Sequence, residues 1–150
     1  MQAQMLAPAA VLVVWTLIVM FWIIPSRFGA VAKLSDKSGL TKKGMRGNDL
    51  EGLIPDKANW PAHNHTHLHE QPTLFYATVL ILAVMGPDAI DVVLAWVYVA
   101  LRIVHSLWQN LVNTIPVRFT LFLASTIALI VLALRAVIAT LLADPSALPA

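Results

Sequence analysis

This chain of 150 residues is 59% hydrophobic and 12% charged, which is more apolar material than a soluble domain of this length can bury. The net charge is only +2 and the basic residues are clustered, so they indicate membrane topology and not a nucleic-acid surface. We therefore expect an integral membrane protein whose surroundings are lipids and which has no nucleic-acid partner. The chain has no cysteine, so any reactive thiol must arrive with a substrate.

The first predicted element is a membrane-spanning helix over about 5–24. Its core, Leu6–Ile24, is uncharged and close to the ~20 residues that cross the hydrocarbon layer. Pro25 follows, with no small-residue cleavage site and no basic region before the run. We therefore expect the segment to stay in the mature protein.

A polar connection over about 25–61 follows and carries seven of the ten basic residues. The positive-inside rule places this connection in the cytoplasm and both termini on the opposite side of the membrane. These topology rules fit a bacterial inner membrane with periplasmic termini. The connection is long and contains several glycines, so it is predicted to be either a mobile lid or a disordered tether.

The second predicted helix, about 62–85, begins with a histidine-rich stretch. Its apolar part, Thr73–Met85, is too short to cross the membrane alone, so the preceding turns should also be helical. On a helix, His63, His67 and Glu70 share one face, and His65 and His69 share the opposite face. This polar group is a candidate site. The alternative is a histidine-rich interfacial surface that binds no ligand.

Two further spanning helices are predicted over about 88–112 and 115–143, completing an all-α bundle of four transmembrane helices. Asp88 and Asp91 match the start of a helix, and Pro116 suits the first turn of the last one. Arg135 lies near the far end of the last helix, where we expect it to extend to the interface.

The third helix carries a polar stripe along one face. Its members are Tyr98, Arg102, His105, Ser106, Gln109 and Asn113. Arg102 would lie roughly 21 Å into the bilayer, where a charge is costly unless it faces protein or water. A second stripe at the start of the last helix, formed by Arg118, Phe122 and Ser125, should face the same region. Alternatively, Arg102 pairs with Glu70 only to orient the helices.

Short motifs along these helices resemble those of the MAPEG superfamily, the membrane-associated proteins in eicosanoid and glutathione metabolism. They are Glu70-x-Pro72-x-x-Phe75, Tyr98-x-x-x-Arg102-x-x-His105, and Arg118 near the start of the fourth helix. Glutathione-using members carry Arg, Asn and Glu on the second helix, where this chain has His63, His67 and Glu70. His105 and Gln109 stand where several eukaryotic members have tyrosines.

The resemblance implies a homotrimer with three sites between subunits, open to the cytoplasm, that use glutathione as co-substrate against an apolar small molecule. The reaction would be a transferase or peroxidase reaction on apolar electrophiles or lipid hydroperoxides. Arg118 would stabilise the thiolate. Glu70 would bind the amino group of the tripeptide and Arg102 a carboxylate. The remaining predicted substrate-binding residues are His63, His67, Tyr98, His105 and Gln109.

Two other functions stay open at this point. The first is a non-catalytic lipid-binding or scaffolding protein of the same fold, favoured by the histidine replacements. The second is a metal site for Zn, Fe or Mn formed by His63, His67, Glu70 and His105. In the leading interpretation, no metal is expected.

Overall fold

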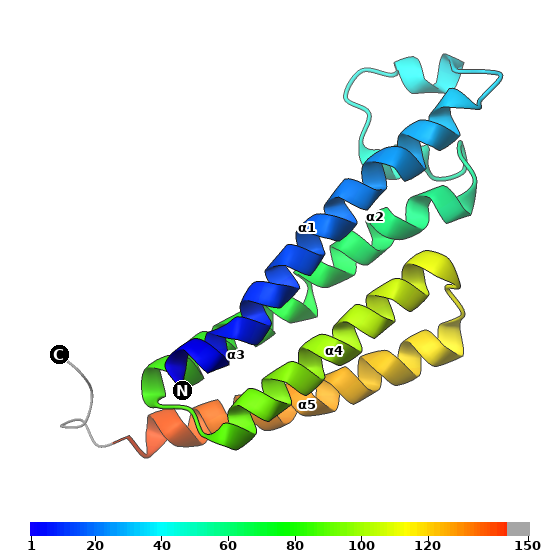
Figure 1. Ribbon diagram of the computed structural model, residues 1–150. Helices are drawn as coiled ribbons and strands as arrows, with labels where there is room; N and C mark the ends of the chain where they lie inside the picture. Colours follow the sequence, from blue (N-terminus) through cyan, green and yellow to red (C-terminus); the bar gives the residue numbers. More distant parts are fainter. Residues whose placement is uncertain (144–150) are drawn as a thin grey trace.

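The computed structural model describes residues 1–143 as an elongated helical bundle (Figure 1). The helices are α1 (Gln2–Ala32), α2 (Asp56–His69), α3 (Gln71–Met85), α4 (Ala89–Leu111) and α5 (Ile115–Leu141). Because α2 and α3 follow each other as one apolar segment, the bundle provides four helical segments long and apolar enough to cross a membrane. The predicted fold class, an all-α membrane protein with four spanning helices, is confirmed.

The first two spans extend beyond their predicted limits. α1 continues through Pro25 to Ala32, so its 31 residues measure about 46 Å, against ~30 Å for the hydrocarbon layer. α2 begins at Asp56, six residues before the predicted start. In Figure 1 these ends of α1 and α2 project past the end of the α4–α5 pair.

The connection between these helix ends is folded. It contains two 3₁₀ turns, Ser38–Thr41 and Gly47–Leu50, and buries Ile54. Arg27 of α1 donates from Nε to Oδ1 of Asn59 in α2, 3.1 Å away, which ties the two projecting ends together. The loop is therefore anchored to two helix ends that are bonded to each other. It comprises residues 33–55, shorter than the predicted 25–61 because α1 and α2 are longer than expected.

The second span is broken at Glu70. The histidine-rich stretch is helical, as predicted, but α2 ends at His69, and Glu70 adopts φ −86° and ψ −94° before α3 begins. Pro72 follows in the first turn of α3, where its missing N–H costs no helical hydrogen bond. The predicted continuous helix over 62–85 is therefore two helices joined at a kink.

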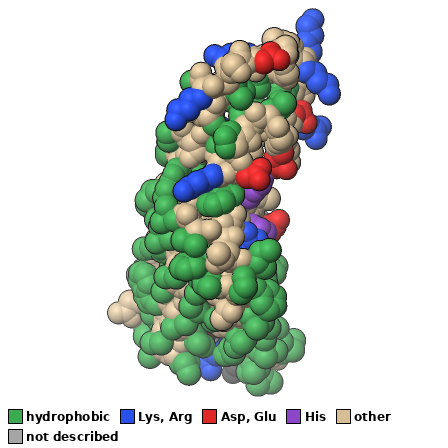
Figure 2. All heavy atoms as spheres, turned by 90° about the vertical axis from the view of Figure 1, so that its right-hand side faces the viewer, with side chains coloured by type: hydrophobic (Ala, Val, Ile, Leu, Met, Phe, Trp, Pro, Cys, Tyr) green, Lys and Arg blue, Asp and Glu red, His purple; other side chains and the backbone are tan. Residues whose placement is uncertain are grey.

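Apolar side chains fill the bundle interior and also cover its outside. The buried core joins all four spans through residues such as Leu12, Phe75, Val99 and Leu132. Many outward side chains are nevertheless exposed, for example Leu74 at 62% and Ile115 at 73%. Figure 2 shows this apolar surface as a belt, with Lys and Arg side chains gathered at the loop end. Such a belt suits contact with lipid.

At the end of the bundle opposite the loop, α4 and α5 are joined by ion pairs. Arg135 of α5 bonds through Nε to buried Asp91, and its Nη2 lies 3.0 Å from Oδ2 of Asp88. The Asp88 N–H also donates to Oδ2 of Asp91 at 2.8 Å, as the predicted helix start requires. Arg135 was expected to extend to the interface at this end; there it also pairs with two carboxylates at the start of α4, a contact that the sequence did not predict.

Candidate functional site

A small cavity opens between the end of α2 and the facing parts of α4 and α5. It has a volume of about 210 Å³ and is lined by His67, His105, Ile115, Arg118, Phe119 and Phe122. Three of the sequence-predicted site residues, one from each helix, therefore meet here. Their ring and guanidinium nitrogens share the cavity with two phenylalanines, so it combines a cation with an apolar wall.

Arg118 is held by the turn that precedes α5. Its Nη1 donates to Oδ1 of Asn113, a residue whose left-handed backbone (φ 60°) allows the short connection from α4 to α5. Asparagine tolerates that conformation better than most residues. The guanidinium is bound by a neutral amide and not by a carboxylate, and Arg118 is only partly buried.

His67 and Glu70 form a pair at the rim of this cavity. His67 Nδ1 lies 2.8 Å from Oε2 of Glu70, and the two side chains are 40% and 58% exposed. Of the three residues predicted to share a face, His67 and Glu70 are therefore in contact, whereas His63 bonds to Glu51. Glu70 is the residue in the helix break, so the kink presents its carboxylate beside the histidine.

Arg102 lies under the site and is almost completely buried. Its Nη2 donates to the backbone carbonyl of His67 at 2.9 Å, and its guanidinium lies 5.9 Å from the centre of the Phe122 ring. Its Nε and Nη1 have no hydrogen-bond partner among residues 1–143. Nor does any described carboxylate lie within 4.0 Å of it, so the alternative of an Arg102–Glu70 ion pair is wrong for this chain. The buried arginine has hydrogen-bonding capacity that the chain itself leaves unused.

The other predicted residues lie away from the cavity lining. His63 bonds to Glu51 of the loop at 2.8 Å. Tyr98 stacks on Phe75 at 4.3 Å and its hydroxyl lies 3.4 Å from Oε1 of Gln71, while Gln109 is buried inside the bundle. The single chain therefore brings together only part of the predicted set.

The alternative metal site is not assembled in the part of the chain that the structure describes. No three His, Asp or Glu side chains there are grouped as metal ligands. His63 is drawn to the loop by Glu51, so the spacing of two histidines on one helix face was insufficient to predict a metal centre.

Sequence reasoning missed two apolar lining residues, Ile115 and Phe119. Together with Phe122 they recur at intervals of four and three residues, the spacing of one helix face. The signal was therefore present, but apolar residues in a spanning helix are too common to single out. The hydrogen bond between Arg118 and Asn113 could not be predicted from sequence spacing, because it depends on the geometry of the turn between α4 and α5.

The comparisons with known proteins give one positive result. No curated protein and no solved structure matched the chain. The model of the MAPEG family matches residues 5–138, which include α2, α3 and α4, most of α1 and α5, and every cavity residue described above. The chain therefore belongs to the MAPEG family.

Proposed function

We propose that the protein is a thiol-dependent membrane enzyme that uses glutathione, or a similar thiol, against apolar electrophiles or lipid hydroperoxides. The observation that carries this proposal is the cavity in which Arg118 lies beside Phe119 and Phe122. A thiolate needs a cation nearby, and its apolar reaction partner needs a surface that excludes water. Both are present within one small space in a chain of the MAPEG family.

The chemistry assigns a role to each charged group. Arg118 favours the ionised thiol and so raises the fraction of active nucleophile at neutral pH. Glu70 can bind an amino group, while the unused N–H groups of Arg102 suit a carboxylate. Tripeptide thiols carry both groups, which supports a substrate of this class.

Two reactions follow from a bound thiolate. In conjugation, sulfur forms a bond to an electrophilic carbon and the leaving group departs with the electron pair. In peroxide reduction, sulfur attacks the O–O bond, which breaks to release an alcohol after protonation. A second thiol then converts the sulfenic acid to a disulfide and water. His67 lines the cavity beside the Glu70 carboxylate and is the candidate donor of the proton to the departing oxygen.

The site of one chain is too small for both substrates. Its volume of about 210 Å³ is below the ~300–1,000 Å³ usual for pockets that enclose a drug-sized ligand. Glu70 and Phe119 are also exposed at its edge. We therefore propose a homotrimer in which a neighbouring copy completes each site, so that a strictly monomeric protein with full glutathione binding would contradict it.

For the membrane we propose a bacterial inner membrane, with the 33–55 loop cytoplasmic and both termini periplasmic. The basic residues gather at the loop end (Figure 2), and the N-terminus lies at the opposite end of the bundle (Figure 1), which supports this orientation. A reporter that works only in the cytoplasm, fused after the last residue, should be inactive. An active fusion would reverse the topology and put the cavity on the other side.

The central experiment titrates glutathione into the purified protein and follows the ultraviolet absorbance of the thiolate. Arg118→Ala should abolish the thiolate signal at neutral pH and reduce turnover of an apolar electrophile by ~100-fold or more, equivalent to losing one preorganised donor. Arg46→Ala removes the same charge from the loop, away from the cavity, and is the matched control. Unchanged thiolate formation in Arg118→Ala would contradict the assignment.

A second candidate function is a non-catalytic lipid-binding or scaffolding protein. It is favoured by His63, which bonds to Glu51 of the loop and so does not contribute to the cavity. Absence of any thiolate signal in the unaltered trimer, with the protein folded, would leave this function as the better one.

A further inference from the structure

A second, larger hollow lies at the loop end of the bundle, between the projecting ends of α1 and α2 and the last turn of α4. Its volume is about 420 Å³. Trp22, Ser26 and Lys33 line it from α1, Lys57 from α2, and Asn110 and Leu111 from α4. This groove shares no lining residue with the cavity beside Arg118. α4 contributes His105 to that cavity, and Asn110 and Leu111 to the groove.

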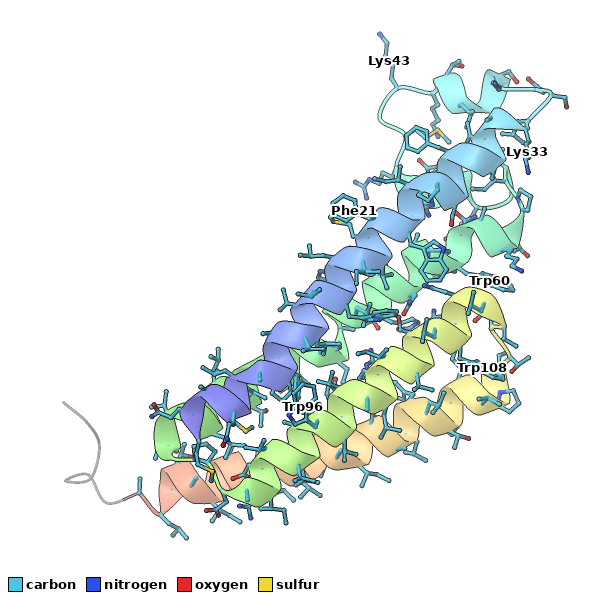
Figure 3. The ribbon with its side chains drawn as sticks, in the orientation of Figure 1. Phe21, Lys33, Lys43, Trp60, Trp96 and Trp108 are labelled. Atoms are coloured by element: carbon cyan, nitrogen blue, oxygen red, sulfur yellow. The ribbon has the colours of Figure 1, made fainter. Side chains whose placement is uncertain are left out.

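The groove lies where the bilayer changes from hydrocarbon to headgroups. The apolar run of α1 ends at Ile24, and Lys33 follows nine residues later, about 13 Å farther along the helix. Lysine side chains can reach back toward the interface from such a position. Trp22, at the other end of the groove, is a residue type that favours the same boundary. Figure 3 places Lys33 at the end of α1.

Polar groups in the groove suit an anion with ester or hydroxyl oxygens. Two ammonium groups, those of Lys33 and Lys57, flank it. Lys57 also occupies the first turn of α2, where the helix dipole adds positive potential, although Asp56 beside it offsets part of that charge. The Lys57 ammonium lies 5.7 Å from the centre of the Trp60 ring. Lys57 is therefore positioned by a contact within its own helix, whereas Lys33 is an exposed lysine that directly follows α1.

Asn110 provides an independent observation. It is 4% exposed, and its Oδ1 accepts a hydrogen bond from Nδ2 of Asn64 at 2.9 Å. Its own Nδ2 has no partner among the described residues. A buried donor without an acceptor is costly. Because Asn110 lines the groove, a rotation of its amide toward a ligand oxygen there would relieve that cost.

We propose that this groove binds one anionic phospholipid of the surrounding leaflet. The phosphate lies between Lys33 and Lys57, the Asn110 amide donates to an oxygen of the glycerol backbone, and an acyl chain leaves past Leu111. A lipid fits better than a soluble anion because the lining is mostly apolar and Leu111 is exposed on the outer surface of the bundle. The bound lipid would stabilise the projecting α1–α2 end.

Native mass spectrometry of the detergent-purified protein tests this, with phosphatidylglycerol and phosphatidylcholine of identical acyl chains as probes. The unaltered protein should bind one phosphatidylglycerol per chain in preference to phosphatidylcholine. Lys33→Gln with Lys57→Gln should weaken phosphatidylglycerol binding by ~10-fold or more, as expected for two lysines near an anionic headgroup. Lys42→Gln with Lys43→Gln makes the same charge change on the loop, outside the groove, and should keep the preference.

A steric variant separates groove binding from general attraction. A Cβ at Gly29, which lines the groove, meets no atom within 4 Å, so Gly29→Leu should fold and fill the space without altering charge. It should block phosphatidylglycerol binding, while the oligomer mass and the unfolding temperature measured without added lipid stay unchanged. The proposal is overturned by equal binding of the two lipids, or by equal losses in the two lysine pairs. It is also overturned if glycerol phosphate in solution displaces the lipid at similar concentration. None of these results depends on thiol turnover, so the two proposals can fail separately.

Discussion

The two ends of the bundle hold arginines in opposite ways, one paired and partly exposed, the other buried and incompletely paired. At the end opposite the loop, Arg135 binds two carboxylates of α4. At the loop end, Arg102 binds only a backbone carbonyl and keeps two nitrogens without a partner in the described chain. Paired charges of the first kind hold two helices together. An arginine of the second kind is costly for folding, and its unpartnered nitrogens support the proposal that it binds a carboxylate from outside the chain.

The largest effect is expected at the fully paired end. Asp91→Ala should lower the free energy of unfolding by about 3 kcal/mol, because it removes the buried partner of Arg135. Thermal unfolding in detergent measures this, and Asp88→Ala, which removes the exposed partner, should cost at most ~1 kcal/mol. Thiolate formation by the folded fraction should be normal. A selective loss of thiol binding in Asp91→Ala would mean that the two ends are not separate in function.

Removing Arg102, the incompletely paired arginine, should weaken glutathione binding without lowering the free energy of unfolding. Arg102→Met keeps a long apolar stem, so stability should be unchanged or should rise by ~1–2 kcal/mol, as when buried charges are replaced by apolar groups. Glutathione affinity should fall by ~10-fold or more, because a charged hydrogen bond to the carboxylate is lost. Isothermal titration gives the affinity, with Tyr98→Phe as the control. Intact affinity together with lower stability would show that Arg102 only orients helices.

The smallest effect is expected at the rim. His67→Asn restores the residue that glutathione-using relatives are expected to carry, so thiol binding should stay the same or improve. His63→Asn, which alters the histidine bonded to Glu51, should leave binding unchanged. Steady-state kinetics separates the possibilities. A fall in kcat with unchanged KM in His67→Asn alone would indicate that this histidine transfers a proton.

Hydrophobic segments and helix signals were sufficient to predict most of the architecture. The four spans, the helical histidine stretch and the turn before α5 follow from apolar length and from residues such as Asp88 and Pro116. The end of α1 was predicted too early, because a proline usually ends a helix, yet α1 continues for seven residues beyond Pro25. Packing against the projecting part of α2 outweighs the local cost there.

Predictions of contacts were less complete for a physical reason. Helix periodicity places residues on a common face, which was sufficient to bring His67, His105 and Arg118 toward one cavity. It does not tell which residue of a loop or distant helix lies opposite. The contact of His63 with Glu51 and that of Arg135 with Asp91 depend on tertiary structure, and neither is encoded in the spacing along one helix.

The kink at Glu70 also shapes the local electric field. α2 ends at His69, so the carbonyls of its last turn have no helical donors and carry the partial negative charge of a helix terminus. Arg102 binds one of these carbonyls, which supplies a dipole and not a compensating ion. The positive potential of the guanidinium therefore persists in surroundings of low polarity, where it acts over a longer range than in water. If a substitution of Pro72 allowed α2 to continue into α3, the His67 carbonyl would accept a hydrogen bond within the helix instead of from Arg102. The attraction of Arg102 for an anion would then change, although Pro72 does not line the cavity.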